Sequence, residues 1–234
     1  DVEQRIDSLV AVDVPFNVVL VLDTSGSTRF YHKDIQEAAV MFVDQLRDND
    51  QVMVVSFASR YRVECEFTSD RGKLRDSIRG TRTGGGTRLY EAVDYVLERL
   101  ESVEGRKAVV LFTDGADTLS RRASASSTIE RVEESGAIFY PLSYDTRDTI
   151  GIQGNPPRAG VPPILFPNGN SWPFPGGNRR RRPLSQRFDL LGTTQGPGRT
   201  PPRLAAEYLL ELATRSGGRP SEAGSLESGS NGFR

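Results

Sequence analysis

The fold is decided by residues 17–23, which read Asn17-Val18-Val19-Leu20-Val21-Leu22-Asp23. Five consecutive aliphatic residues are too few to cross a membrane, and a Thr-Ser-Gly-Ser cluster follows at 24–27, so the run predicts a central parallel strand buried on both faces. This strand ends on the carboxylate of Asp23. Because Ser25 and Ser27 lie two residues apart on a glycine-containing turn, we expect their hydroxyls to converge on the point that Asp23 faces.

A second stretch far downstream repeats this pattern. Residues 107–113 predict another buried strand, and Asp114 follows it directly. Between the two strands, three glycines at 84–86 form a loop, and the Thr87 that follows opens a helix. In an open parallel sheet, ligands bind in the crevice beyond the carboxyl ends of the strands. We therefore expect one shared site, built from Asp23, Ser25, Ser27, Thr87 and Asp114.

At these residues the chain resembles the von Willebrand factor type A (VWA) domain, whose metal-ion-dependent adhesion site (MIDAS) has the pattern Asp-x-Ser-x-Ser, then a distant Thr, then Asp. The sequence around Asp23, Thr87 and Asp114 is most similar to that of a bacterial VWFA-related group first recognised in acidobacteria. The resemblance spans roughly residues 14–144 and resumes near Leu204. It implies an adhesion-type module in which the metal binds an acidic residue of a protein ligand.

The resemblance also implies a role for each site residue. Ser25 and Ser27 would coordinate the ion directly, Thr87 directly or through water, and Asp23 and Asp114 largely through waters. Mg²⁺ prefers oxygen ligands and keeps several waters, which suits this set, with Mn²⁺ or Ca²⁺ as possible substitutes. The set lacks the His and thiolate ligands expected of zinc.

Simpler interpretations of single residues compete with the metal site. Either serine alone could cap the following helix, since Ser is a favoured N-cap residue. We interpret Asp117 as a cap or supporting group and not a ligand, and His32 as a solvated residue at a helix start. Arg29 and Arg88 flank the site, where contact with an acidic partner is the less favoured interpretation because exposed arginines are common.

Strands alternating with helices predict an α/β fold with a doubly wound, mostly parallel sheet, helices on both faces and a Rossmann-like arrangement. Residues 61–67 suit an antiparallel edge strand, in which strict alternation would place Cys65 on the inward face with Val63 and Phe67, as core packing and not as a reactive thiol. The predicted organisation has four parts: an N-terminal arm (1–14), the VWA core (15–144), a Pro/Gly/Arg-rich insertion (145–202), and a last helix with an irregular tail (203–234).

The insertion leaves a strand at its carboxyl end, so we expect it beside the metal as a specificity loop or lid. It carries eight Arg against three Asp, including the run at 179–182, within a chain of net charge −1. No nucleic-acid motif accompanies this run, so we favour a solvated cluster or contact with an acidic protein or surface over nucleic acid. After the last predicted helix, residues 219–224 make a poor strand, and the family's closing C-terminal helix is expected to be missing.

Enzyme classes are disfavoured by the same residues. Ser25 stands where an aspartyl phosphatase needs a second Asp, there is no Gly-x-Ser-x-Gly, Walker or dinucleotide loop, and His32 is the sole histidine. We predict a binding module and not an enzyme. The alternatives are a structural or assembly component stabilised by its metal, or an accessory subunit of a chelatase or AAA-type complex.

No apolar run approaches about 20 residues, so direct membrane insertion is not expected. The resemblance favours an exported protein, and the chain is expected to derive from a longer precursor; the partner and oligomeric state are left open.

Overall fold

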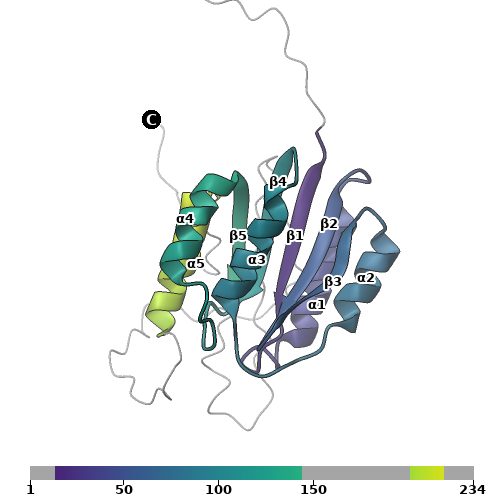
Figure 1. Ribbon diagram of the computed structural model, residues 1–234. Helices are drawn as coiled ribbons and strands as arrows, with labels where there is room; N and C mark the ends of the chain where they lie inside the picture. The colour runs from purple at the N-terminus through teal and green to yellow at the C-terminus, as the bar shows by residue number, and fades with distance from the viewer. Residues whose placement is uncertain (1–13, 144–200, 219–234) are drawn as a thin grey trace, which may run out of the picture.

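The computed structural model describes residues 14–143 and 201–218 and contains one five-stranded sheet in that part of the chain. The strand order is β3-β2-β1-β4-β5 (Figure 1). All neighbouring strands are parallel except β2 and β3, which are antiparallel. The strands are β1 (Phe16–Asp23), β2 (Gln51–Phe57), β3 (Tyr61–Thr68), β4 (Arg106–Thr113) and β5 (Ala137–Ser143).

Strand β1 lies at the centre of the sheet, as its aliphatic run predicts. Val19 is paired with Met53 of β2 on one side and with Val109 of β4 on the other. Because successive side chains of a strand point to opposite faces, Leu20 enters one hydrophobic core and Val21 enters the other. A strand buried on both faces therefore organises two cores at once.

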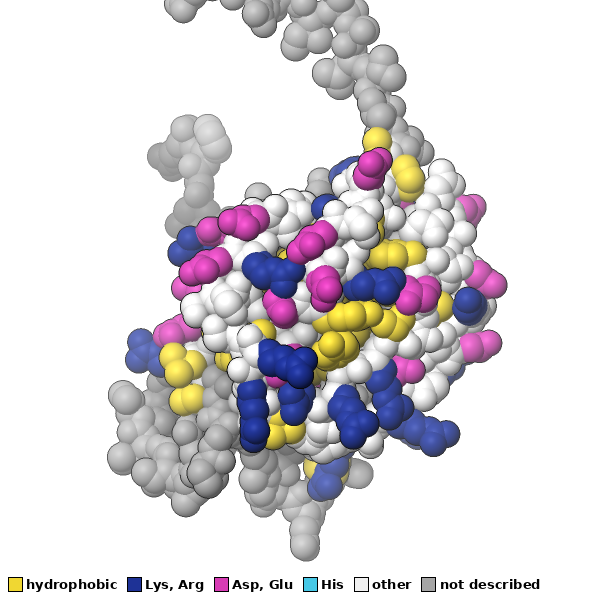
Figure 2. All heavy atoms as spheres, in the orientation of Figure 1, with side chains coloured by type: hydrophobic (Ala, Val, Ile, Leu, Met, Phe, Trp, Pro, Cys, Tyr) yellow, Lys and Arg dark blue, Asp and Glu magenta, His cyan; other side chains and the backbone are white. Residues whose placement is uncertain are grey.

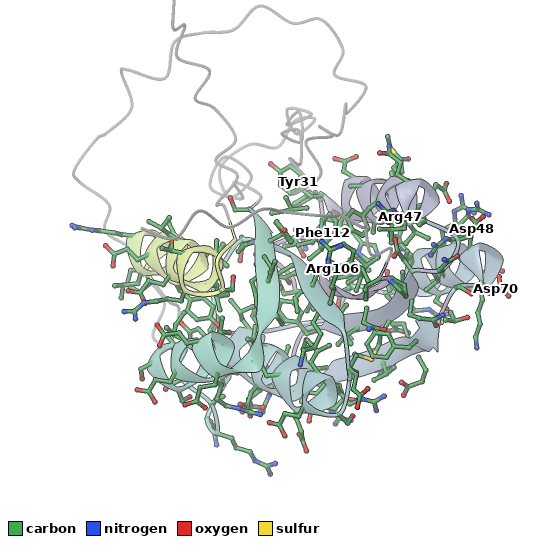
Figure 3. All side chains as sticks on the ribbon, turned by 90° about the horizontal axis from the view of Figure 1, so that it is seen from above. Tyr31, Arg47, Asp48, Asp70, Arg106 and Phe112 are labelled. Carbon is green, nitrogen blue, oxygen red and sulfur yellow. The ribbon has the colours of Figure 1, made fainter. Side chains whose placement is uncertain are left out.

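Helices cover both faces of the sheet, so the fold is doubly wound. Looking along the strands, Figure 3 shows α1 on one side of the sheet and α3 with α4 on the other. The first core contains α1 (His32–Gln45) and α2 (Arg71–Gly80). The second contains α3 (Leu89–Glu101), α4 (Ala125–Ser135) and α5 (Pro202–Arg215), with α5 packed against α4 and β5. The predicted α/β class and the antiparallel edge strand are both confirmed.

Local signals set several helix ends. The Asp70 side chain accepts the Lys73 N–H at the start of α2, and Ser124 and Ser127 form a reciprocal capping box at the start of α4. Helix α4 ends at Gly136, whose φ of 63° is the left-handed conformation predicted for that glycine. These caps fix the residues at which α2 and α4 begin and at which α4 ends.

The predicted position of Cys65 is confirmed only in part. Cys65 is buried as expected, but it packs in the core with α1 and α2, whereas Val63 and Phe67 pack against the opposite core. Two shifts in the pairing of β2 with β3, on either side of the Val54 and Cys65 pair, interrupt the alternation. A β-bulge adds one residue to a strand and so moves the next side chain to the other face, which a strict two-residue period cannot anticipate.

The predicted boundaries can be followed only in part. The helix expected after Leu204 is α5. The N-terminal arm, nearly all of the insertion and the doubtful last strand fall on residues 1–13, 144–200 and 219–234, which lie outside the described residues. The domain boundaries and the missing C-terminal helix therefore stay predictions.

Candidate metal site at the carboxyl edge of the sheet

The Asp23 carboxylate, at the carboxyl end of β1, is fully buried and held by two donors. Its Oδ1 accepts the Ser25 N–H at 2.9 Å, and its Oδ2 accepts the Thr113 hydroxyl at 2.7 Å. Thr113 is the last residue of β4 and was not among the predicted site residues. The available signal was a polar residue that ends the apolar run 108–112, directly before Asp114. Asp23 is thus oriented from both of its neighbouring segments.

The turn after β1 brings the two predicted serines together. The Ser25 and Ser27 hydroxyl oxygens lie 3.0 Å apart, and the Thr28 hydroxyl stabilises the turn by donating to the carbonyl oxygens of Asp23 and Ser25. Helix α1 begins only at His32 and has no side-chain cap at its N-terminus. Capping of α1 is therefore not the role of either serine.

The Thr87 loop is bound to both other loops of the site. The Gly84 N–H donates to the Thr24 carbonyl at 2.7 Å, and the Thr87 N–H donates to the Thr118 hydroxyl at 2.9 Å. Gly86 has a φ of 67°, and a Cβ on it would collide with the Leu119 side chain, so glycine is required there. Thr87 is buried, between the segments that carry Asp23 and Asp114.

Asp114 directly follows β4 and is half-buried, with its Oδ1 accepting the Ala116 N–H at 3.0 Å. Its charge acts on Asp23. Burial is the main cause that raises the pKa of Asp23, to about 7, and repulsion from Asp114 raises it further, against the lowering effect of the hydrogen bonds from Ser25 and Thr113. In the protein without metal, the site therefore holds a carboxyl group that resists ionisation.

Two other polar residues near the site serve the structure. Asp117 accepts the Tyr90 N–H in the first turn of α3 and two bonds from Ser120, so the prediction of a cap is confirmed. His32 does start α1, but the prediction of a solvated side chain is wrong. It is half-buried and its Nε2 bonds to the Thr81 carbonyl at 3.0 Å, because α1 packs against α2 and the segment that follows it.

The five predicted residues thus lie on loops at the carboxyl edge of the sheet, after β1, before α3 and after β4. They carry two carboxylates and three hydroxyls, all oxygen donors. Over residues 14–143 and 201–218, no three His, Cys, Asp or Glu side chains cluster in a way that could hold a metal. The arrangement defines an α/β domain with a candidate site for a hard divalent cation.

Residues 18–116 match the family model of the von Willebrand factor type A domain. The chain therefore carries a domain of this family, and such domains are in general protein-interaction modules. No curated protein sequence matches the chain. The more specific likeness to the acidobacterial group stays a resemblance.

Solved structures support the fold. One similar structure is the conserved hypothetical protein BatB from Bacteroides thetaiotaomicron, with 18% identity over 88% of each chain and a TM-score of 0.52. Another is an aerotolerance-related membrane protein from Bacteroides fragilis NCTC 9343 with multiple mutations to serines, with 19% identity over 89% of this chain and 92% of that one and a TM-score of 0.54. In the described part of the present chain, no helix is long and apolar enough to span a bilayer.

Proposed function

We propose that the domain binds Mg²⁺ at the carboxyl edge of the sheet and uses it to hold an acidic side chain of a protein ligand. Ser25 and Ser27 would coordinate the ion, with Thr87 beside them, and Asp23 and Asp114 would act mainly through bound waters. The chemistry that the ion supplies is Lewis acidity toward an incoming carboxylate. The residues of the chain position the ion and limit its protein ligands.

The separation of the two serine hydroxyls supports this proposal most directly. Adjacent ligands of an octahedral ion with bonds of about 2.1 Å lie about 3.0 Å apart, and the Ser25 and Ser27 oxygens are separated by 3.0 Å. The two hydroxyls are hydrogen-bonded to each other at this distance, and the Thr28 hydroxyl bonds and the Ser25 N–H bond to Asp23 hold the turn that carries them. Little rearrangement would be needed to take up the ion.

The charge of the donor set favours an acidic ligand. Serine and threonine hydroxyls bring no charge to a cation, so the ion would keep its attraction for a further carboxylate. The repulsion between Asp23 and Asp114 is also the kind of unbalanced charge that a divalent cation neutralises. We further propose a binding module and not an enzyme, since the sole histidine, His32, is engaged with the Thr81 carbonyl.

Titration calorimetry of the EDTA-treated protein with Mg²⁺ and Mn²⁺ tests the site. We expect saturable one-site binding in the parent and none in the double variant Ser25→Ala/Ser27→Ala. The matched control is Ser124→Ala/Ser126→Ala, which removes two hydroxyls that lie 3.0 Å apart at the start of α4; it should bind like the parent. Equal binding by all three proteins would falsify the proposed site.

We also propose that the protein is exported, as the family resemblance suggests and as the membrane protein among its structural neighbours supports. Fractionation of cells that express the full-length protein checks this, and recovery of the protein in the cytoplasm alone would contradict it. The alternative of a structural component stabilised by its metal predicts that Ser25→Ala/Ser27→Ala lowers the Tm without changing ligand binding.

A further inference from the structure

The loops at the carboxyl edge of the sheet are rich in arginine. The described loops at this edge are 24–31, 58–60, 81–88 and 114–124, and together they contain six arginines, two aspartates and no lysine or glutamate. The loops at the opposite edge, 46–50, 69–70, 102–105 and 136, contain four acidic residues and one arginine. In Figure 2, Lys and Arg side chains gather toward the lower end of the molecule and acidic ones dominate above. The loops at the two edges therefore differ in charge, although Lys73 and Arg106, at the starts of α2 and β4, add basic residues at the amino edge.

Five of these arginines form what we call the arginine rim. All five are exposed, and no acidic side chain in the described part of the chain pairs with them. The sixth, Arg88, is excluded because it forms an ion pair with Glu91 at 2.7 Å. The rim consists of Arg29, Arg60, Arg82, Arg121 and Arg122.

Large apolar side chains that are close in sequence to these arginines are exposed. Phe30 is 49% exposed, with the Arg29 guanidinium 4.5 Å from its ring centroid, and Leu119 is 36% exposed against the Gly86 loop. Tyr61, beside Arg60, is 40% exposed. Aromatic residues and arginine are enriched in protein interfaces. Nucleic-acid bases could also stack on Phe30, but the divalent cation proposed beside these arginines calls for a carboxylate ligand, so we argue for a protein partner.

We propose that the arginine rim, with Phe30 and Leu119, is the docking surface for an acidic segment of the protein partner. This rests on the proposed function: one carboxylate of the segment reaches the metal, and further Asp and Glu side chains pair with the rim while apolar residues cover Phe30 and Leu119. The planar guanidinium of arginine can donate two parallel hydrogen bonds to the two oxygens of one carboxylate. The rim therefore supplies long-range attraction and orientation, and the metal supplies the final contact.

The test uses the full chain and two short fluorescein-labelled peptides, one in which Glu and Asp alternate with Leu and Phe, and one with Gln and Asn in place of the acids. Anisotropy is measured in Mg²⁺ and in EDTA, at low and at physiological salt. The rim variant is Arg82→Glu/Arg121→Glu. The control, Lys73→Glu/Arg106→Glu, makes the same change of charge at the opposite edge. Circular dichroism establishes that both variants are folded.

We expect the rim variant to weaken binding of the acidic peptide at low salt about ten-fold or more, in Mg²⁺ and in EDTA alike, and the control less than about two-fold. Equal losses in both variants, equal binding of the amide peptide, or tighter binding of single-stranded oligothymidine than of the acidic peptide would each overturn the proposal. The Ser25→Ala/Ser27→Ala variant distinguishes the proposed metal site from the proposed docking surface. It should lose the gain in affinity due to Mg²⁺ and keep the salt-dependent binding in EDTA.

Discussion

The two edges of the sheet each hold a buried aspartate fixed by two donors, yet the two residues stand in different surroundings. At the amino edge, Asp50 lies directly before β2 and accepts the backbone N–H groups of Phe16 and Arg47 at 2.8 and 3.0 Å. It thereby joins the loop before β2 to the start of β1. At the carboxyl edge, Asp23 accepts one backbone N–H and one hydroxyl, beside a serine pair and a second carboxylate. The same arrangement of hydrogen bonds closes a loop at one edge and orients a carboxylate beside the candidate metal site at the other.

The surfaces around these two aspartates differ in the same sense. Exposed acidic residues such as Asp48, Asp70 and Glu104 lie in the loops of the amino edge, whereas the arginine rim lies in the loops of the carboxyl edge. Surface charge contributes little to the stability of a domain but strongly affects which molecules approach it. The amino edge therefore serves mainly the fold, and the carboxyl edge carries the features expected of a binding face.

Replacing each aspartate in turn should separate these roles most sharply. Asp23→Ala should lower Mg²⁺ affinity by about ten- to a hundred-fold, because it removes the carboxylate that positions the serine pair. Asp50→Ala should leave Mg²⁺ affinity within about two-fold but lower the free energy of unfolding by about 2 kcal/mol, since two part-buried N–H groups lose a charged acceptor. Calorimetry and urea unfolding measure the two effects. The comparison breaks if Asp50→Ala weakens metal binding as much as Asp23→Ala does.

The raised pKa of Asp23 predicts a strong dependence of both properties on pH. The folded, metal-free protein binds the Asp23 proton more tightly than the unfolded chain does, because burial and Asp114 raise the pKa from 3.8 to about 7. This group's contribution to stability is therefore fully present below about pH 4 and is lost as the pH rises through about 7. Mg²⁺ competes with the proton, so its apparent affinity should rise about ten-fold per pH unit up to about pH 7 and then level off.

Calorimetry between pH 5 and pH 8 checks this dependence, with thermal unfolding measured alongside. Asp23→Asn, which has no titrating group at this position, should flatten the pH dependence of any remaining affinity. A parent protein that binds Mg²⁺ equally well at pH 5 and pH 8 would show that Asp23 does not take part in binding as a carboxylate.

Residue pattern predicted the architecture because the relevant signals are local. The buried runs that became β1 and β4, the stripes that became α1 and α3, and the glycine that ends α4 all reflect single elements. The positions of Asp23 and Asp114 followed, since the carboxyl ends of parallel strands share an edge. The two register shifts beside Cys65 and the packing of His32 against the α2 segment depend on neighbouring elements, which the sequence of one element does not specify.

Thr113 illustrates the same limit within the site. Its hydroxyl donates to Asp23 and also accepts the Gly115 N–H at 3.0 Å, so one side chain connects the ends of β1 and β4. As a threonine at the end of a strand, it also fits an ordinary β-strand residue, because Thr is common in strands. Only the pairing of β1 with β4 brings its hydroxyl to the carboxylate. Contacts of this kind link residues that are 90 positions apart.

The smallest expected effect comes from removing this one hydroxyl. Thr113→Val keeps the shape of the side chain but leaves Asp23 Oδ2 and the Gly115 N–H without this partner. We expect the free energy of unfolding to fall by about 1–2 kcal/mol. Because the lost hydrogen bond lowers the pKa of Asp23, that pKa should rise further and Mg²⁺ affinity at pH 7 should fall a few-fold, with a smaller loss at pH 9.

The matched control is Thr128→Val, which removes another fully buried threonine hydroxyl, bonded to Tyr208 at 3.0 Å and to α4 carbonyl oxygens. It should cost a similar amount of stability and leave Mg²⁺ affinity unchanged at both pH values. If the two valine variants bind Mg²⁺ alike, Thr113 serves only to join β1 to β4. If only Thr113→Val binds more weakly, and the deficit shrinks at high pH, the hydroxyl positions Asp23 and keeps it ionised for the metal.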